Sequence, residues 1–223
     1  MRHSPSHTTP ALIKKVREDA TRNNQGHPPS GSSNRTDLLP LLAVALNDET
    51  EEVSVQAVLT LAYMINEKTL SLLENSLKNH YGDVRYYACV GLAWLGRSER
   101  LRPGIIRKLQ EARDSMSEDS FDVKLHAASS LLDLDAPQDP GIFIEAMRKE
   151  GANHAIAAGA LAKLKRKDAI ELIVKALEKA EDSEDHWCGK ALEGLTGEAF
   201  GKDYGKWKDW LEKNRKLLPD QLK

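Results

Sequence analysis

The amino-acid sequence predicts an all-α fold, an alpha-alpha superhelix of about five helical hairpins followed by a C-terminal capping helix. Three observations support this prediction. Alanine, leucine, lysine and glutamate are abundant, and valine and isoleucine nowhere alternate with polar residues as they do in β-strands. A helical pattern recurs five times in one register. Apolar residues at helical spacing also precede most copies of this pattern, which predicts a second helix in each unit.

The chain begins with a segment, residues 1–35, that predicts a flexible basic arm. It contains six Lys/Arg against two Asp/Glu, and it includes the run NNQGHPPSGSSN, which is typical of linkers. Within it, TPALIKKVREDA has the spacing of a short amphipathic helix with Leu12, Ile13, Val16 and Ala20 on one face. The arm carries a net charge of +4 and could dock on the acidic array that follows.

The second helix of each hairpin carries the repeated pattern. Its clearest copy is DVRYYACVGLAWLG, and it recurs as EVSVQAVLTLAYM, DVKLHAASSLLDL, ANHAIAAGALAKL and SEDHWCGKALEGL. In each copy a core stripe is expected at positions −4, 0, +4 and +7 from one register residue. The register residues fall 31, 39, 30 and 31 residues apart, and they are Ala57, Ala88, Ala127, Ala157 and Cys188.

The first helix of each hairpin is predicted from apolar pairs that lie 15 and 11 residues before the register residue. These pairs are Leu42 and Leu46, Leu73 and Leu77, Ile142 and Ala146, and Ile173 and Leu177. The third unit is eight residues longer, and its polar run ARDSMSEDS predicts an extended loop. Gly96 and Gly197 stand where a glycine commonly ends a helix.

Five copies in register resemble the short bacterial HEAT-like repeats, which are also known from phycobilisome lyase subunits. The resemblance covers residues 36–197. The segment LTGEAFGKDYGKWKDWLEKN resembles the ending of bacterial proteins of this repeat type, and implies a terminal cap over residues 198–223. The resemblance implies a HEAT-like or armadillo-type solenoid that acts as a non-enzymatic scaffold for protein binding.

The C-terminal cap is expected to be a helix with two indoles on one face. Trp207, Trp210, Leu211 and Asn214 fall at i, i+3, i+4 and i+7. We expect the indoles to cover the apolar edge of the last hairpin, as terminal units of repeat proteins must. The alternative is that the pair stacks on a ligand.

A candidate binding surface follows from the positions that point away from the core stripe. In HEAT-like arrays the second helices line the concave surface. At about 100° per residue, positions −2, −1 and +2 are expected to face outward there, and Trp94 at +6 projects outward too. Position −2 holds Val55, Tyr86, Leu125, Ala155 and His186, and position −1 holds Gln56, Tyr87, His126, Ile156 and Trp187.

These rows are too apolar for a surface that only meets water. One interpretation is that tight curvature or the N-terminal arm covers them. The other is a concave groove for a protein or peptide of unknown identity. Its anchors would be Tyr86, Tyr87, Trp94, His126 and Trp187.

The sequence contains no catalytic or metal-binding motif. It lacks HExxH, a glycine-rich phosphate loop and a GxSxG turn, and it has no His-Glu dipeptide of the kind found in deoxyhypusine-hydroxylating HEAT proteins. The acidic runs DETEE (48–52) and EDSED (181–185) are expected in solvated turns, where carboxylates favour helix N-termini. Cys89 and Cys188 are 99 residues apart and are expected to be buried packing residues. We therefore expect no metal and no cofactor.

Two other function classes stay open as alternatives. A HEAT-like DNA glycosylase would use Tyr87, Trp94 and Trp187 as its aromatic residues and Asp133 as its carboxylate. Charge disfavours nucleic acid, because the net charge is −2 for the chain and −7 for residues 37–150. A chromophore lyase-type subunit is implied by the repeat resemblance alone.

The sequence predicts a soluble protein. The longest apolar runs are about half the roughly 20 residues that a membrane-spanning helix needs. No apolar core of a secretory signal is present, so the cytoplasm is slightly favoured, with a signal peptide cleaved from a precursor left open. The oligomeric state is not indicated by any pattern.

Overall fold

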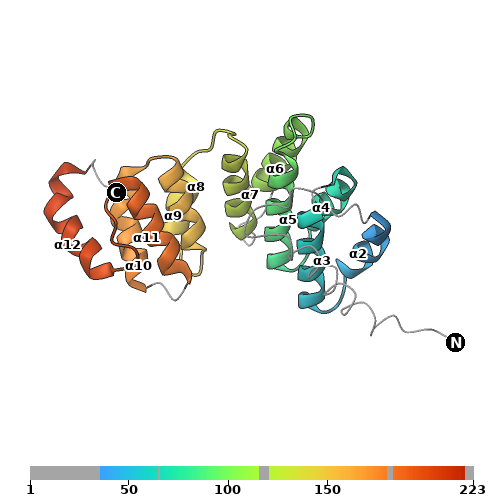
Figure 1. Cartoon of the computed structure of the whole chain (residues 1–223), viewed down its shortest axis with the longest axis horizontal. Helices are drawn as coiled ribbons and strands as arrows, with labels where there is room; N and C mark the ends of the chain where they lie inside the picture. The colour runs from blue at the N-terminus through green and yellow to red at the C-terminus, as the bar shows by residue number, and fades with distance from the viewer. Residues whose placement is uncertain (1–35, 65, 116–120, 180–182, 219–223) are drawn as a thin grey trace. The chain divides into compact units, whose positions relative to one another are not determined.

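The computed structural model of the chain is all-helical (Figure 1). The structure describes residues 36–64, 66–115, 121–179 and 183–218, and no β-strand occurs among them. None of the helices in these ranges is both long and apolar enough to cross a membrane. The predicted N-terminal arm lies outside the described residues. The chain divides into two compact units, Met1–Ala136 and Pro137–Lys223.

The described helices of the first unit pair into three hairpins. In each hairpin a first helix packs against the second helix that follows it, and the second helices α3, α5 and α7 pack side by side. The elements are η1 (Thr36–Leu38), α2 (Leu39–Ala45), α3 (Glu51–Met64), η2 (Glu67–Thr69), α4 (Leu70–Ser76), α5 (Gly82–Leu95), α6 (Arg102–Ser115) and α7 (Phe121–Asp133).

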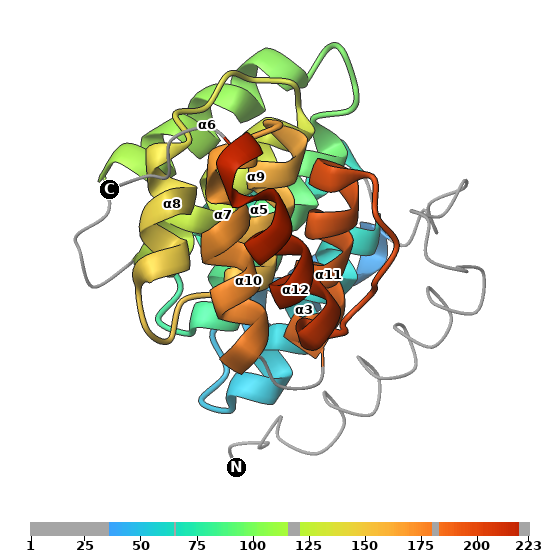
Figure 2. The same cartoon turned by 90° about the vertical axis from the view of Figure 1, so that its left-hand side faces the viewer.

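The second unit contains two further hairpins and a last helix. Here α9 packs against α11, and α12 packs against α10 (Figure 1, Figure 2). The elements are α8 (Gly141–Arg148), α9 (His154–Lys163), η4 (Lys167–Ala169), α10 (Ile170–Lys179), α11 (Ser183–Thr196), α12 (Tyr204–Asn214) and η5 (Arg215–Leu217).

The predicted register of the second helices is confirmed by their burial. All five register residues are 0% exposed. The stripe of α5 is buried along its whole length, at Val84, Ala88, Leu92 and Leu95. Close packing of neighbouring helices depends on small residues, because a Cβ at Gly91 of α5 would lie 2.9 Å from the Cβ of Ala62 in α3. The repeated alanines and leucines therefore form the core of each hairpin.

The insertion in the third hairpin is helical where it is described, so the prediction of an extended loop over ARDSMSEDS is wrong for residues 112–115. These residues are the last turn of α6, which has 14 residues where α2 and α4 have seven each. Ile105, Leu109 and Ala112 are buried along α6 at helical spacing, so its apolar stripe extends into the insertion. Residues 116–120 lie outside the described residues.

Only one of the two predicted helix-ending glycines adopts the left-handed conformation. Gly197 does so after α11, with φ of 85°. Gly96 also ends its helix, as the C-cap of α5, but with φ of −68° it does so without the left-handed conformation. A Cβ there would lie 2.8 Å from Cδ1 of Leu134, so a larger residue at this position would displace the side chain of Leu134, which follows α7.

Adjacent hairpins of the first unit are joined by polar contacts from one turn to the previous one. The side-chain amide of Asn79 donates to the carbonyl oxygen of Leu46 at 2.8 Å. The hydroxyl of Tyr81 donates to the carbonyl oxygen of Glu49 at 2.6 Å. Leu46 follows the last residue of α2, and the carbonyl groups at a helix end lack partners within the helix. The turn of the second hairpin thus completes the helix end of the first.

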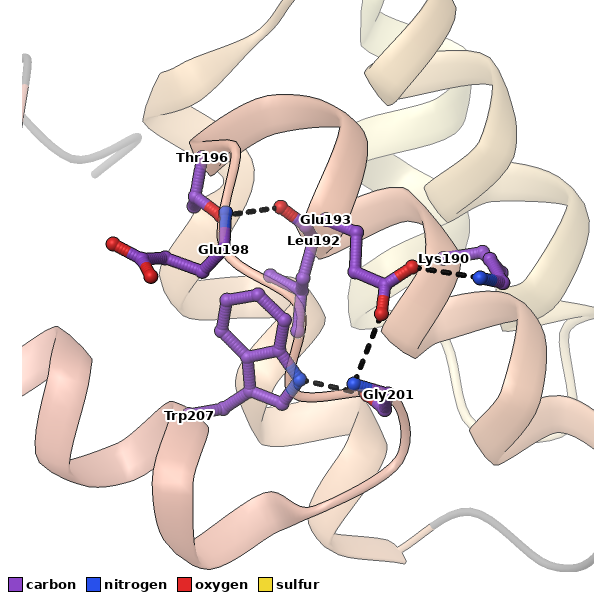
Figure 3. Close-up of polar contacts among 7 residues, drawn as sticks. All are labelled: Lys190, Leu192, Glu193, Thr196, Glu198, Gly201 and Trp207. Carbon is purple, nitrogen blue, oxygen red and sulfur yellow. Dashed lines mark hydrogen bonds and ion pairs between the residues drawn. The ribbon is translucent and has the colours of Figure 1, made fainter.

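The C-terminal cap is anchored by Trp207, which is 0% exposed (Figure 3). Its Nε1–H donates to the carbonyl oxygen of Gly201 at 2.8 Å. The amide of Gly201 donates to Oε1 of Glu193 at 3.0 Å, and Oε2 of Glu193 accepts from Nζ of Lys190 at 2.8 Å. This chain of contacts binds the segment before α12 to α11.

The sequence left two roles open for the indoles, packing against the last hairpin or stacking on a ligand. Trp207 is fully buried, so its ring is not available to a ligand. Trp210 is half-buried, and its Nε1–H donates to Oε1 of Glu198 at 3.2 Å. The ring of Phe200 meets that of Trp207 edge-on at a centroid distance of 4.8 Å. Trp207 is therefore a buried packing residue, as expected for a helix that covers the last hairpin.

Candidate functional site

Aromatic rings gather on the second helices of the first unit. Two rings of α5, Tyr86 and Tyr87, lie 4.6 Å apart between centroids, and the ring of Tyr86 lies 4.2 Å from that of His126 in α7. Tyr63 of α3 and Trp94 of α5 form another pair at 5.2 Å. We call these five residues, Tyr63, Tyr86, Tyr87, Trp94 and His126, the aromatic face.

The position of each ring on its helix follows from its distance in sequence to the register residue of the repeat. Tyr63 and Trp94 both lie six residues after the register residue of their helix, and α3 packs directly against α5. The close approach at Gly91 brings the two helices near enough for the rings to meet. Tyr86 and His126 lie two residues and one residue before their register residues, on neighbouring helices. Repetition of the hairpin therefore turns separate aromatic positions into one cluster.

Burial within the cluster is uneven. Tyr63, Tyr86, Tyr87 and Trp94 are half-buried, whereas His126 is only 8% exposed. Leu125, in the row predicted to point away from the core, is fully buried. The prediction of an outward orientation is therefore wrong for Leu125 and His126.

The reason is side-by-side packing. Position −2 or −1 lies on the flank of a helix, and a neighbouring helix covers that flank in a layer of parallel second helices. In α7 the neighbour is α5, whose Tyr86 ring lies over the imidazole of His126. The half-buried tyrosines and Trp94 form the accessible part of the aromatic face.

The aromatic face has little positive charge. Burial lowers the pKa of His126 to about 4, so its imidazole is neutral at pH 7. The pKa of the Tyr86 phenol is raised, first by burial and then by the nearby phenols of Tyr87 and Tyr63 and the carboxylate of Asp83. At pH 7 these rings are therefore uncharged surfaces.

The three helices below the rings are acidic overall. Together α3, α5 and α7 contain five carboxylates and two cations, a net charge of −3, from Glu51, Glu52, Asp83, Asp122, Asp133, Arg85 and Lys124. Nη1 of Arg85 donates to the carbonyl oxygens of Asn79 at 2.8 Å and His80 at 2.9 Å, which holds this cation at the turn before α5.

The fifth predicted anchor, Trp187, belongs to the second unit. Its side chain is 59% exposed, and it meets the ring of His186 edge-on at 5.4 Å. Ala155 and Ile156, at the equivalent positions of α9, are half-buried. The structure thus brings Tyr86, Tyr87 and His126 into ring contact, pairs Trp94 with Tyr63, and places Trp187 on a separate unit.

Sequence reasoning missed Tyr63. The signal was available, because Tyr63 stands at +6 in the first repeat, where Trp94 stands in the second. A comparison of the +6 position along the repeats gives Tyr63, Trp94 and Asp133 in the first unit. Two rings and an exposed carboxylate therefore occupy equivalent positions on three packed helices.

The described residues hold no group of three or more His, Cys, Asp or Glu side chains that could bind a metal ion. Cys89 is buried, and burial raises its pKa to about 12, so its thiol does not supply a thiolate near neutral pH. In the DETEE run, Oδ1 of Asp48 accepts from the amide of Thr50, which is a turn contact. The EDSED run has no described side chains.

No family model matches the chain, and a search of curated proteins finds no match. What the site can do is therefore inferred from its residues: half-buried rings above acidic helices form a surface for binding by stacking and apolar contact.

Proposed function

We propose that the protein is a HEAT-like solenoid that binds a segment of another protein, without catalysis, through its second helices. Support comes from the register, because every register residue is buried, and from helices that pack as consecutive hairpins. Repeats of this kind bury their apolar stripes only by stacking on their neighbours, and they use the exposed layer of helices for binding. The sequence resemblance to short bacterial HEAT-like repeats points the same way.

One observation carries the binding role: Tyr63, Tyr86, Tyr87 and Trp94 are half-buried rings on one layer of helices. Aromatic side chains contribute large contact areas to protein interfaces and are frequent among residues that dominate binding energy. The core stripe of each helix is buried without a contribution from Tyr63, Tyr86 or Trp94, whereas Tyr87 also packs against the core. Trp187, 59% exposed on α11, is an exposed aromatic side chain of the second unit.

The nucleic-acid alternative has less support. A glycosylase would need cations near the rings to bind phosphates, but the helices that bear the rings carry a net charge of −3. Asp133, the carboxylate required by that alternative, is exposed at the end of α7. The chromophore lyase alternative gains no supporting observation among the described residues.

The test compares proteins captured from the source cell by the wild type and by the double variant Tyr86→Ala/Trp187→Ala. Val44→Ala is the matched control, because Val44 is 68% exposed on α2 and lies on a first helix. Captured proteins are then purified and titrated singly against each variant. The proposal expects loss of binding in the double variant, with wild-type binding in the control and unchanged helical circular dichroism in both. Equal affinity of every captured protein for the wild type and the double variant would contradict it.

A further inference from the structure

We propose that residues 9–20 of the chain pack through their apolar face on the side of α3 that points away from α5, and so close the N-terminal end of the array. The partner of this surface is therefore a segment of the same chain. Such a cap would form whether or not the aromatic face binds another protein. The burial of two residues of α3, the pattern of the segment and the charges of both partners support it.

Helix α3 is buried on a side where the described part of the chain gives it no second helix as a neighbour. In α5, the residue at +3 is Gly91, and a Cβ there would lie 2.9 Å from the Cβ of Ala62 in the preceding second helix. The residue at +3 in α3 is Thr60, and α3 is the first second helix of the described chain. Thr60 is nevertheless only 1% exposed. Something other than a preceding hairpin covers it.

Leu59 is buried on the same helix without belonging to the core. It stands at +2, which lies about 200° around the helix from the register residue and so opposite the core stripe. At this position α5 and α7 carry Val90 and Ser129, which are half-buried. Leu59 is 8% exposed, although α3 packs against one described second helix and α5 packs against two. It is also not part of the apolar cluster formed by the register residues of the first unit. One cover that extends from Thr60 to Leu59 accounts for both.

The segment before the first hairpin can reach this side of α3. Residues 1–35 end directly before Thr36, where η1 leads into α2 of the same hairpin. Residues 21–35, which separate the segment from Thr36, can span up to about 50 Å when extended. Helix α3, with 14 residues, is only about 21 Å long. A tethered segment also avoids the entropic cost of bringing two molecules together.

The stretch TPALIKKVREDA has the pattern that a helical cover requires. Its apolar residues at helical spacing are Leu12, Ile13, Val16 and Ala20. A helix this short is marginal in water and is stabilised mainly when its apolar face packs on another surface. The side of α3 that carries Leu59 offers such a surface.

The charges of the two partners are complementary. Residues 36–64, which form the first hairpin, contain five carboxylates and no Lys or Arg, whereas residues 1–35 contain six Lys/Arg and two Asp/Glu. The carboxylates precede α2 or lie around the turn between α2 and α3, and they are Asp37, Asp48, Glu49, Glu51 and Glu52. They flank the buried side of α3 rather than line it. They therefore attract the arm, while the apolar contact determines where it packs.

A cysteine at position 60 reports whether this side of α3 is covered. Cys89 and Cys188 are both 0% exposed, so the new thiol of Thr60→Cys is the one that a reagent can detect in the native protein. We expect this thiol to react slowly with a disulfide reagent at pH 8 in the full-length chain. Leu59→Cys is a second reporter on the same side and should behave in the same way.

Variants of the arm then test what covers the reporter. Adding Leu12→Asp and Val16→Asp should speed the reaction of the thiol about tenfold or more, because carboxylates cannot replace the buried apolar side chains. The matched control is Ala11→Asp with Thr21→Asp, which makes the same change of charge away from the apolar face. This control should leave the reaction rate within about twofold of the unaltered arm.

Three results would overturn the proposal. Fast reaction of both reporters in the chain with an unaltered arm would show that α3 is open on this side. Equal protection with the Leu12→Asp/Val16→Asp arm and with the control arm would show that the described helices alone bury the reporters. Protection that rises with protein concentration would identify a second copy of the chain as the cover. Far-UV circular dichroism checks that each variant is folded, and if Thr60→Cys is not, the result with Leu59→Cys decides.

Discussion

Replacing Gly189 of α11 by alanine should separate the C-terminal cap from the last hairpin. A Cβ at this position would lie 2.2 Å from the carbonyl oxygen of Gly201, 2.6 Å from its carbon and 3.2 Å from the amide nitrogen of Lys202. All three are backbone atoms, so no side-chain rotation relieves the overlap. The segment around Gly201 would have to move, and this segment accepts the indole N–H of Trp207 and donates to Glu193.

The expected loss of stability in Gly189→Ala is the sum of three contributions. Forcing an extra methyl group into a packed contact costs about 1 to 3 kcal/mol. Loss of two hydrogen bonds adds about 1 kcal/mol each. Alanine in a helix interior stabilises the helix by about 1 kcal/mol relative to glycine, which offsets part of this loss. The free energy of unfolding should therefore fall by about 2 to 4 kcal/mol, a large part of the stability of an ordinary domain.

Urea unfolding followed by tryptophan fluorescence and far-UV circular dichroism measures this change. Gly194→Ala is the matched control, because it makes the same substitution on the same helix where no atom lies within 4 Å of the added Cβ. That control should be neutral or stabilising by up to about 1 kcal/mol. If Gly189→Ala unfolds at the same urea concentration as Gly194→Ala, the reasoning about the cap is refuted.

Three further predictions concern the first unit. Gly91→Ala should lower the free energy of unfolding by about 1 to 3 kcal/mol in urea titrations, because its Cβ would lie 3.0 Å from the Cα of Ala62; a stabilising effect would contradict the close helix contact. The thiol of Cys89, buried and with its pKa raised to about 12, should react with a disulfide reagent at pH 8 only when urea unfolds the protein, and rapid reaction of two thiols in the native protein would disprove its burial. The pKa of His126 is about 4 in the folded protein, below the ordinary value of 6.5 for an imidazole. The stability that depends on a neutral His126 is therefore complete above pH 6.5 and is lost as the pH falls towards 4. His126→Phe should remove about 3 kcal/mol of this pH dependence from urea unfolding curves, and parallel curves for the two proteins would contradict the assignment.

The core could be predicted from the sequence because its signal is repeated. Each second helix brings alanine and leucine back at the same spacing, so one register explains the burial of Ala57, Ala88 and Ala127 together. The same reasoning could not predict the burial of Leu125 and His126. A helical wheel describes one helix, whereas burial of a flank depends on the distance and tilt of the neighbouring helix.

The third hairpin shows a second limit of pattern reasoning. Its polar composition indicated a loop, but α6 continues through residue 115 because a helix needs only one apolar stripe, and Ala112 extends that stripe. Gly96 shows a third limit of pattern reasoning. A glycine at a helix end looks the same in the sequence whether it adopts a left-handed conformation or leaves space for a neighbouring side chain such as Leu134. In the aromatic face, the sequence analysis named four of the five rings, with the wrong orientation for His126, and missed Tyr63, whose partner Trp94 lies on another helix.

The bonds from Asn79 and Tyr81 to the carbonyl oxygens of Leu46 and Glu49 affect how such an array can grow or shrink. A hairpin excised at its own boundaries would leave those oxygens without their donors, and would carry donors that had lost their acceptors. The acceptors lie in the turn of the first hairpin and the donors in the turn of the second, so only a segment that contains both hairpins can be duplicated or deleted without this loss. Gene rearrangements that change the number of repeats should therefore move these two hairpins together rather than cut between them.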